Sequence, residues 1–348
     1  MRNPGLDILR CIAVLLVIFR HSSLNNILQH FGWLGVDLFF VLSGFLVSGL
    51  LFVEYKNYQV VDIKRFLIRR SFKVFPPFYF FVLTTVIFNF LYNNTNYDVS
   101  ELLHEVFYLQ SYLPNIWQHT WSLAVEEHFY FSLAFIVFVF SRKQLLEKKD
   151  LVIYSLLGFL ILSLIMRVHT TYPYKDQDIY PFFQTHLRSD GIIVGVLLSY
   201  LFHFTEYLKN LKYKWVYLIL SLSLIAPALF YRGGGYFMNT IGLTLVNIGF
   251  GLLVFLSISV NSNLYSSNIV KYPIKSICFI GINSYSIYLW HLNVKSAVSF
   301  LPYNHYTINL LYILLSIVVG IIFSFLIERT SLRIRELLFP GKKSLNKF

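Results

Sequence analysis

The chain is dominated by long apolar runs, each close to the length that crosses a lipid bilayer. A spanning α-helix needs about 20 predominantly apolar residues. Inside a bilayer the backbone polar groups must be satisfied within the segment, so such runs form helices. The sequence therefore predicts an all-α polytopic membrane protein with about ten transmembrane helices. The runs lie at 6–28, 33–53, 74–92, 121–141, 151–168, 185–204, 213–231, 237–258, 276–299 and 307–327.

Composition supports a membrane class and a single transmembrane unit. Only 13% of the 348 residues are charged, against about 25% in soluble domains. The first apolar run lacks the basic segment and the small-residue cleavage site of a signal peptide, so we expect it to stay in the membrane. Every connection is too short for a soluble domain. We expect one transmembrane domain over 1–335 and a basic cytoplasmic tail over 336–348.

The formal charge of +12 is distributed as topology requires. Lys and Arg gather in alternate connections, whereas the long loop 93–119 contains neither. By the positive-inside rule both termini are then cytoplasmic. This distribution explains the charge without a nucleic-acid partner. Cys11 and Cys278 lie in apolar runs and indicate neither a disulfide framework nor a metal site, so no metal is expected.

The first apolar run carries ionisable residues at a helical spacing. Intramembrane ionisable groups are costly and by default are hypotheses about function. Arg10 and His21 are eleven residues apart, which is three turns, so they share one face about 16 Å apart along the axis. We expect Arg10 in the cytoplasmic half and His21 in the outer half. Arg20 points about 100° away, and the expected role is snorkelling or pairing with a carboxylate.

Asp37 opens the second run at about the depth of His21, because the two helices are antiparallel. A carboxylate bonded to the imidazole would fix its tautomer and raise its basicity. Alternatively, Asp37 pairs with Arg20 or caps its helix. Further along, small residues including Ser43 and Gly44 permit close helix packing or leave room for a thin ligand. Periodicity does not choose between these alternatives.

A dense basic stretch, "KRFLIRRSFKVFPPFYF" (64–80), follows the second run. One interpretation is anchoring by the positive-inside rule or binding of anionic lipids. The other is a site for a phosphorylated cofactor, because Arg forks match phosphate oxygens. The physics of the sequence favours the two equally.

Three further stretches carry polar groups expected near the outer end of the bundle. "TWSLAVEEHFYF" (120–131) contributes Glu126, "LRSDGIIVGV" (187–196) contributes Arg188 and Asp190, and "SYSIYLWH" (284–291) contributes His291. Interface anchoring is the alternative for the aromatic residues of the last stretch. With His21 and Asp37 outside, and Arg10 and the basic stretch inside, the pattern is typical of a protein that takes a phosphorylated donor from the cytoplasm and serves an outer acceptor.

Six motifs in order resemble those of the acyltransferase-3 family of bacterial membrane acyltransferases. They are "LDILRCIAVLLVIFRHSS", "GWLGVDLFFVLSGFL", "RFLIRRSFKVFPPFY", "TWSLAVEEHFYF", "RSDGIIVGVLL" and "SYSIYLWH". Members move an acyl group, usually acetyl from acetyl-CoA, to hydroxyls of extracytoplasmic carbohydrates. The resemblance implies that Arg10 and His21 match the family's Arg/Lys-to-His pair, that Arg69 and Arg70 match its cytoplasmic arginines, and that Glu126 matches its acidic residue.

The chain departs from the family pattern at a few positions. Lys73 stands where Arg is common, so a phosphate contact there would be a point charge rather than a fork. His128 replaces a frequent Gln, and Glu328-Arg329-Thr330 replaces Glu-x-Pro.

The resemblance predicts an O-acyltransferase of the bacterial inner membrane, in contact with membrane lipids. Acyl-CoA, most often acetyl-CoA, would be the co-substrate, and His21 the general base, with Asp37 or Glu126 orienting it. Direct transfer and a transient acyl-histidine both stay open. Expected donor contacts are Arg10, Ser43, Arg65, Arg69, Arg70 and Lys73. Expected contacts of the acceptor, a glycan or lipid-linked sugar, are Trp121, Glu127, Arg188, Asp190 and His291.

Two rival functions come from other classes. A polysaccharide-unit exporter or flippase would also have ten helices and intramembrane charges. A lipid-binding structural membrane protein would not need the graded placement of Arg10 and His21. Release of free coenzyme A from labelled acetyl-CoA and an acceptor separates the enzyme from a flippase.

Overall fold

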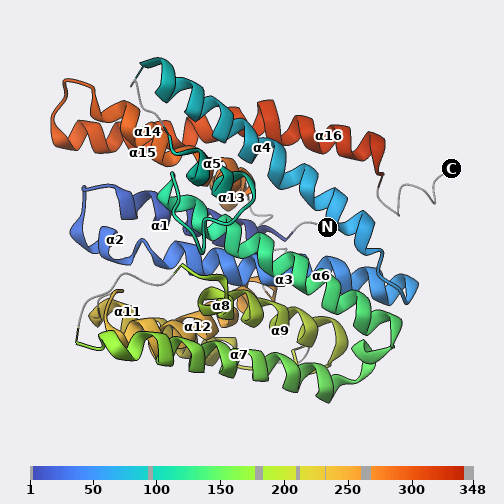
Figure 1. Cartoon of the computed structure of the whole chain (residues 1–348). Helices are drawn as coiled ribbons and strands as arrows, with labels where there is room; N and C mark the ends of the chain where they lie inside the picture. The colour runs from blue at the N-terminus through green and yellow to red at the C-terminus, as the bar shows by residue number, and fades with distance from the viewer. Residues whose placement is uncertain are drawn as a thin grey trace.

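The computed structural model describes residues 3–92, 97–176, 183–208, 212–231, 233–259 and 268–340, and within these ranges the regular structure is entirely helical (Figure 1). Its α-helices are α1 (Pro4–His21), α2 (Asn26–Phe31), α3 (Leu34–Tyr58), α4 (Ile63–Tyr92), α5 (Val99–Val106), α6 (Trp121–Arg142), α7 (Lys149–Thr171), α8 (Thr185–Arg188), α9 (Asp190–Phe204), α10 (Lys214–Ile225), α11 (Pro227–Phe230), α12 (Leu243–Ile258), α13 (Asn268–Ile282), α14 (Ser284–Ser299), α15 (His305–Phe323) and α16 (Arg329–Leu338). Short π-helical turns precede α12 at Met238–Gly242 and follow α15 at Ser324–Glu328.

Within the described residues, six helical segments are long and apolar enough to cross a membrane. They are Leu34–Tyr58, Ile63–Leu91, Gln118–Arg142, Lys149–Tyr174, Met238–Ile258 and His305–Leu338. The all-helical, membrane-embedded class is thus confirmed, whereas the count of ten spans and the cytoplasmic orientation of the termini are not. The predicted tail boundary at 335 falls inside α16, and residues 341–348 lie outside the described part of the chain.

Several predicted runs are divided, each at an identifiable residue. The run 276–299 breaks at Asn283, where the amide donates to Phe279 O at 2.6 Å and accepts from Arg329 at 3.2 Å. The run 213–231 breaks before Pro227, whose nitrogen has no hydrogen to donate to the preceding turn. A hydropathy window sees neither interruption, because the flanking residues remain apolar.

The basic stretch 64–73 forms the first three turns of α4, so this helix is longer than the predicted run 74–92. Asp62 supports its start by accepting the backbone N–H of Arg65 at 3.0 Å. Pro76 and Pro77 lie inside the helix. The cations therefore project from a helix along the bundle rather than from a loop.

Helices α1 and α3 run through the middle of the bundle, with α14, α15 and α16 on one side and α7, α9 and α12 on the other (Figure 1). The most extensive packing joins α3 to α9. A Cβ at Gly44 would collide with Ile192 O, and one at Gly195 with Val41 O, so glycine lets the two backbones touch. Of the two interpretations of the small residues, Gly44 serves close packing.

The bundle has a basic end and an opposite end. Helix α3 ends, α4 begins and α16 ends toward the right of Figure 1, and the cations Arg65 and Arg69 lie here. Helices α1 and α3 are antiparallel, since Gly35 packs against Ala13 and Gly32 packs against Arg20. His21 and the start of α3 therefore lie at the opposite end.

Candidate functional site

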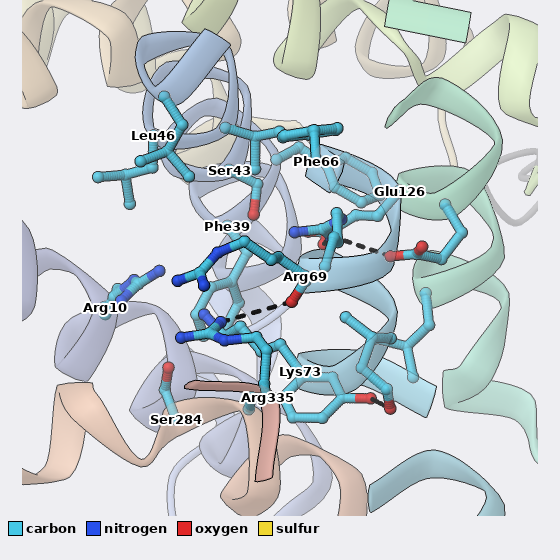
Figure 2. Close-up of a pocket in the computed structure, with 18 of the residues that line it drawn as sticks. Arg10, Phe39, Ser43, Leu46, Phe66, Arg69, Lys73, Glu126, Ser284 and Arg335 are labelled. Atoms are coloured by element: carbon cyan, nitrogen blue, oxygen red, sulfur yellow. Dashed lines mark hydrogen bonds and ion pairs between the residues drawn. The ribbon is translucent and has the colours of Figure 1, made fainter. Parts of the chain in front are cut away.

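A cavity of about 690 Å³ opens toward the basic end, and we call it the basic cavity. Its mouth includes Glu54, Asn57 and Tyr58 from the end of α3. Figure 2 shows side chains from α1, α3, α4, α6 and α16 around it. The charged side chains of its lining are Arg10, Glu54, Arg65, Arg69, Arg70, Lys73, Glu126, Glu127 and Arg335, and Ser43 also lines it. All six predicted donor contacts belong to this lining.

Arg70 is held by two carboxylates within the basic cavity. Its Nη2 lies 2.9 Å from Glu127 Oε1 and 3.8 Å from Glu126 Oε2. Its guanidinium carbon lies 3.7 Å from the centre of the Tyr130 ring. Glu126, predicted to orient His21, and Glu127, predicted to contact the acceptor, thus both lie beside Arg70 in the lining of the basic cavity. Because α4 is helical through its basic stretch, it brings Arg70 to these residues of α6.

Helix α16 closes over the arginines at the cavity mouth. Arg69 donates to both carboxylate oxygens of Glu336, at 2.6 and 3.2 Å, and also to Phe339 O. Arg65 donates to Pro340 O. Arg335 lines the cavity, donates to Glu336 at 2.6 Å and contacts Arg69 O at 3.4 Å. Arg335 is not among the predicted donor contacts, because nothing in its local sequence pattern connects it to α4.

Lys73 differs from these arginines. It is half-buried in the lining of the basic cavity, and within the described part of the chain no carboxylate forms an ion pair with it. Figure 2 shows it with Arg10 and Arg335 around the same space. A cation in this state is available to an anionic ligand.

A second cavity of about 640 Å³ opens toward the opposite end, and we call it the histidine cavity. Gln29, His30 and Gly32 from the α1–α3 connection lie at its rim. Its polar lining consists of Arg20, His21, Gln118, His119, Arg188 and Lys295, and its aromatic lining includes Trp33, Trp121 and Phe183. Arg10 and His21 thus line different cavities, in the order along α1 that their spacing predicted.

The rings of His21, His119 and His291 lie close together at the histidine cavity. The ring centroids of His21 and His291 lie 5.2 Å apart, as do those of His119 and His291. His291 is completely buried and belongs to the lining of neither cavity. Its Nδ1 contacts Tyr288 O, and its Nε2 has no hydrogen-bond partner among the described residues. The His291 ring therefore lies buried beside the His21 ring, outside the lining of both cavities.

Asp37 pairs with Arg188 rather than with His21 or Arg20. Arg188 Nη2 lies 2.8 Å from Asp37 Oδ1, and both side chains are buried. The Arg188 guanidinium also lies 5.3 Å from the Trp121 ring. Arg20 instead donates to Gln29 O at 3.0 Å, which fastens the end of α1 to the following connection. Asp37 thus pairs with Arg188 in place of His21, because α9 packs on α3 and the preceding helix α8 ends at Arg188, beside Asp37.

Asp190 is engaged in a second buried ion pair. Arg167 Nη1 of α7 lies 2.7 Å from Asp190 Oδ2, and both side chains are almost completely buried. Asp190 belongs to the lining of neither cavity. Its ion pair links α7 to α9. The predicted acceptor contacts Trp121 and Arg188, in contrast, do line the histidine cavity.

Comparison with known proteins gives the family. The profile of the acyltransferase-3 family, described as an acyltransferase domain, matches residues 3–329. The chain belongs to the acyltransferase-3 family. The match covers the lining of both cavities except Arg335. No solved structure matches this acyltransferase-3 protein.

Named relatives share most of this acyltransferase-3 chain. The peptidoglycan O-acetyltransferase OatA of Listeria monocytogenes is 30% identical over 323 residues, covering 83% of this chain and 48% of that protein. The O-acetyltransferase OatA of Staphylococcus aureus (strain NCTC 8325) is 27% identical over 327 residues, covering 83% and 50%. The chain spans about half the length of these curated relatives.

Proposed function

We propose that this protein is a membrane O-acyltransferase that moves an acyl group from acyl-CoA to a hydroxyl of a glycan on the other side of the membrane. The observation that carries the proposal is the pair of cavities. One opens at the basic end and is lined by cations, the other opens at the opposite end and contains His21, and both include Val36 and Tyr288 in their linings. Acetyl is the favoured acyl group, since the relatives are named O-acetyltransferases.

The basic cavity has the chemistry that a coenzyme A thioester requires. The phosphates would bind Arg65 and Arg69 at its mouth and the half-buried Lys73, because guanidinium forks and an ammonium group suit phosphate oxygens. The pantetheine arm would extend along the part lined by Ser43 and Arg10. With this donor, the basic end would lie in the cytoplasm of a bacterium, where acyl-CoA is made, as the positive-inside rule predicts.

The histidine cavity would hold the acceptor. Trp33 and Trp121 offer flat apolar surfaces for sugar rings, and Arg188 and Gln118 offer hydrogen-bond donors. A glycan acceptor is supported by the peptidoglycan O-acetyltransferase among the relatives. The acceptor would enter from the extracytoplasmic side of the inner membrane.

His21 would act as general base. Neutral imidazole takes the proton of the acceptor hydroxyl as its oxygen forms a bond to the thioester carbonyl carbon. Collapse of the tetrahedral intermediate breaks the C–S bond, and the sulfur takes the proton from His21. Asp37 and Glu126 then act indirectly, by holding Arg188 and Arg70. Since the imidazole must be uncharged, we expect activity to fall at acidic pH.

Labelled acetyl-CoA tests the proposal. Purified protein with a glycan acceptor should release coenzyme A in an acceptor-dependent way, and His21→Ala should reduce the rate by about 10²–10⁴-fold. His169→Ala, on the exposed face of α7, is the matched control and should keep the rate. Acceptor-dependent release that survives in His21→Ala would remove the mechanism. A protein that releases no coenzyme A but moves glycan units across vesicles would instead be a flippase.

A further inference from the structure

Two residues form the boundary between the two cavities. Val36 of α3 and Tyr288 of α14 contribute to both linings. His21 belongs to the lining of the histidine cavity alone, and the candidate donor-binding cations belong to the lining of the basic cavity alone. On the proposed function, the acyl end of the donor must cross this boundary to reach His21.

Hydrogen bonds from both sides hold the Tyr288 side chain in this boundary. Its hydroxyl donates to His119 O at 2.8 Å, and Ser122 Oγ lies 2.6 Å from the same hydroxyl. Ser122 lines the basic cavity and His119 lines the histidine cavity. The phenol hydroxyl is therefore held between one residue from the lining of each cavity.

Aromatic rings enclose the Tyr288 ring on its other sides. Ring centroids lie 6.2 Å away for Phe39, 5.8 Å for His119 and 5.5 Å for His291. Tyr288 is only 6% exposed although it touches two cavities. Val36 is the smaller of the two shared residues, so Tyr288 is the larger side chain at this boundary.

We propose that Tyr288 is a partition residue that keeps the thioester away from water in the histidine cavity until the acyl end displaces its side chain. This inference rests on the proposed function and adds a positioning role. Without the partition, water could replace the acceptor. Its oxygen would bond to the thioester carbonyl carbon and the C–S bond would break, giving a free carboxylic acid and coenzyme A thiol. Excluding water prevents this side reaction.

Two substitutions separate the bulk of Tyr288 from its hydroxyl. Tyr288→Ala should raise acceptor-independent release of coenzyme A relative to acceptor acylation by about tenfold or more, which is about 1.4 kcal/mol. Tyr288→Phe keeps the ring but loses the two hydrogen bonds that hold it, so its leak should be smaller than that of Tyr288→Ala. An unchanged ratio in Tyr288→Ala, or a leak in Tyr288→Phe as large as in Tyr288→Ala, overturns the partition. Wild-type protein without acceptor-dependent release would overturn the proposed function instead.

Thiol labelling tests the partition without relying on catalysis. Ser43→Cys places a thiol in the basic cavity, in a background where Cys278→Ser removes the more exposed native cysteine. A membrane-impermeant thiol reagent added to intact cells should label this cysteine only when Tyr288→Ala is also present. Gln118→Cys, in the histidine cavity, is the positive control and should react in both backgrounds. Two outcomes overturn the partition: labelling of Ser43→Cys while Tyr288 is present, or no labelling of Ser43→Cys when Tyr288→Ala is added.

Discussion

Arg188 Nη2 lies 2.8 Å from Asp37 Oδ1, and both side chains are buried. This ion pair joins α3 to the segment that leads into α9, at the edge of the histidine cavity. A buried ion pair is weak evidence for net stabilisation, but removing one partner leaves an uncompensated charge in a medium of low dielectric constant.

Asp37→Ala should therefore destabilise the protein by about 3–5 kcal/mol. Thermal unfolding in detergent measures the loss. Replacing both partners, as in Asp37→Leu with Arg188→Met, should recover much of the stability, because no charge is left unpaired. A double variant no more stable than Asp37→Ala would show that the charge pairing is not the cause.

Arg69→Gln and Arg70→Gln should behave differently although the two arginines are neighbours. Arg69 lies at the cavity mouth, so losing its charge-assisted hydrogen bonds to phosphate should raise KM for acetyl-CoA by about 10–100-fold, from about 1.5–3 kcal/mol. Arg70 is paired with Glu127 and Glu126. Its loss leaves the buried carboxylate of Glu127 beside the half-buried one of Glu126 without a cation, so folded yield should fall.

Size-exclusion chromatography and KM measurements on the two variants check this contrast. Arg70→Lys keeps the charge but not the planar fork, and it should restore part of the yield. Normal yield of Arg70→Gln with a raised KM would show that Arg70 binds the donor directly.

Glu336→Gln should lower KM for acetyl-CoA. The Glu336 carboxylate forms ion pairs with Arg69 and Arg335, so it competes for Arg69 with the phosphate of the donor. Its side chain is 47% exposed, and exposed ion pairs contribute about 0.2–1 kcal/mol, so the gain should be at most about fivefold. Glu101→Gln in α5, remote from this site, is the control. A higher KM in Glu336→Gln would mean that the carboxylate holds the arginines in the binding geometry.

Glu105 should make the segment 107–120 sensitive to pH. Burial raises the pKa of its carboxyl to about 7, against the hydrogen bonds from Thr120, Trp117 and Ile116, which lower it. Because the folded pKa is the higher one, the stabilisation is complete below about pH 4.5 and is lost as pH rises through 7. The loss approaches about 3 kcal/mol. Limited proteolysis of residues 107–120 between pH 5 and 8 should show the change.

Glu105→Gln should remove most of this pH dependence, because the amide oxygen can still accept the hydrogen bonds but does not titrate. Glu101→Gln leaves Glu105 in place and should keep the dependence. Equal pH dependence of proteolysis in the wild type and in Glu105→Gln would refute the role of Glu105.

The sequence was sufficient for much of the fold and for part of the candidate site. Apolar runs of bilayer length predict the helices. The spacing of Arg10 and His21 predicts that the two side chains lie at different depths along α1. Six motifs predict the family, and the family profile confirms it. The division of two predicted runs was missed, because interruptions such as Asn283 and Pro227 are single residues within apolar surroundings. A window average cannot register them.

Tertiary structure alone decided which charges meet. Helical periodicity fixes the face and the depth of a residue on its own helix, but the partner comes from whichever helix packs there. The packing of α9 on α3 brings Arg188 to Asp37, and α4 brings Arg70 to Glu127. Helix α16 brought Arg335 to the basic cavity, and α14 placed Tyr288 between the two cavities. The contacts of Arg70 with Glu127 and of Arg335 with Arg69 join residues 57 and 266 positions apart in the chain, and local periodicity carries no information across such separations.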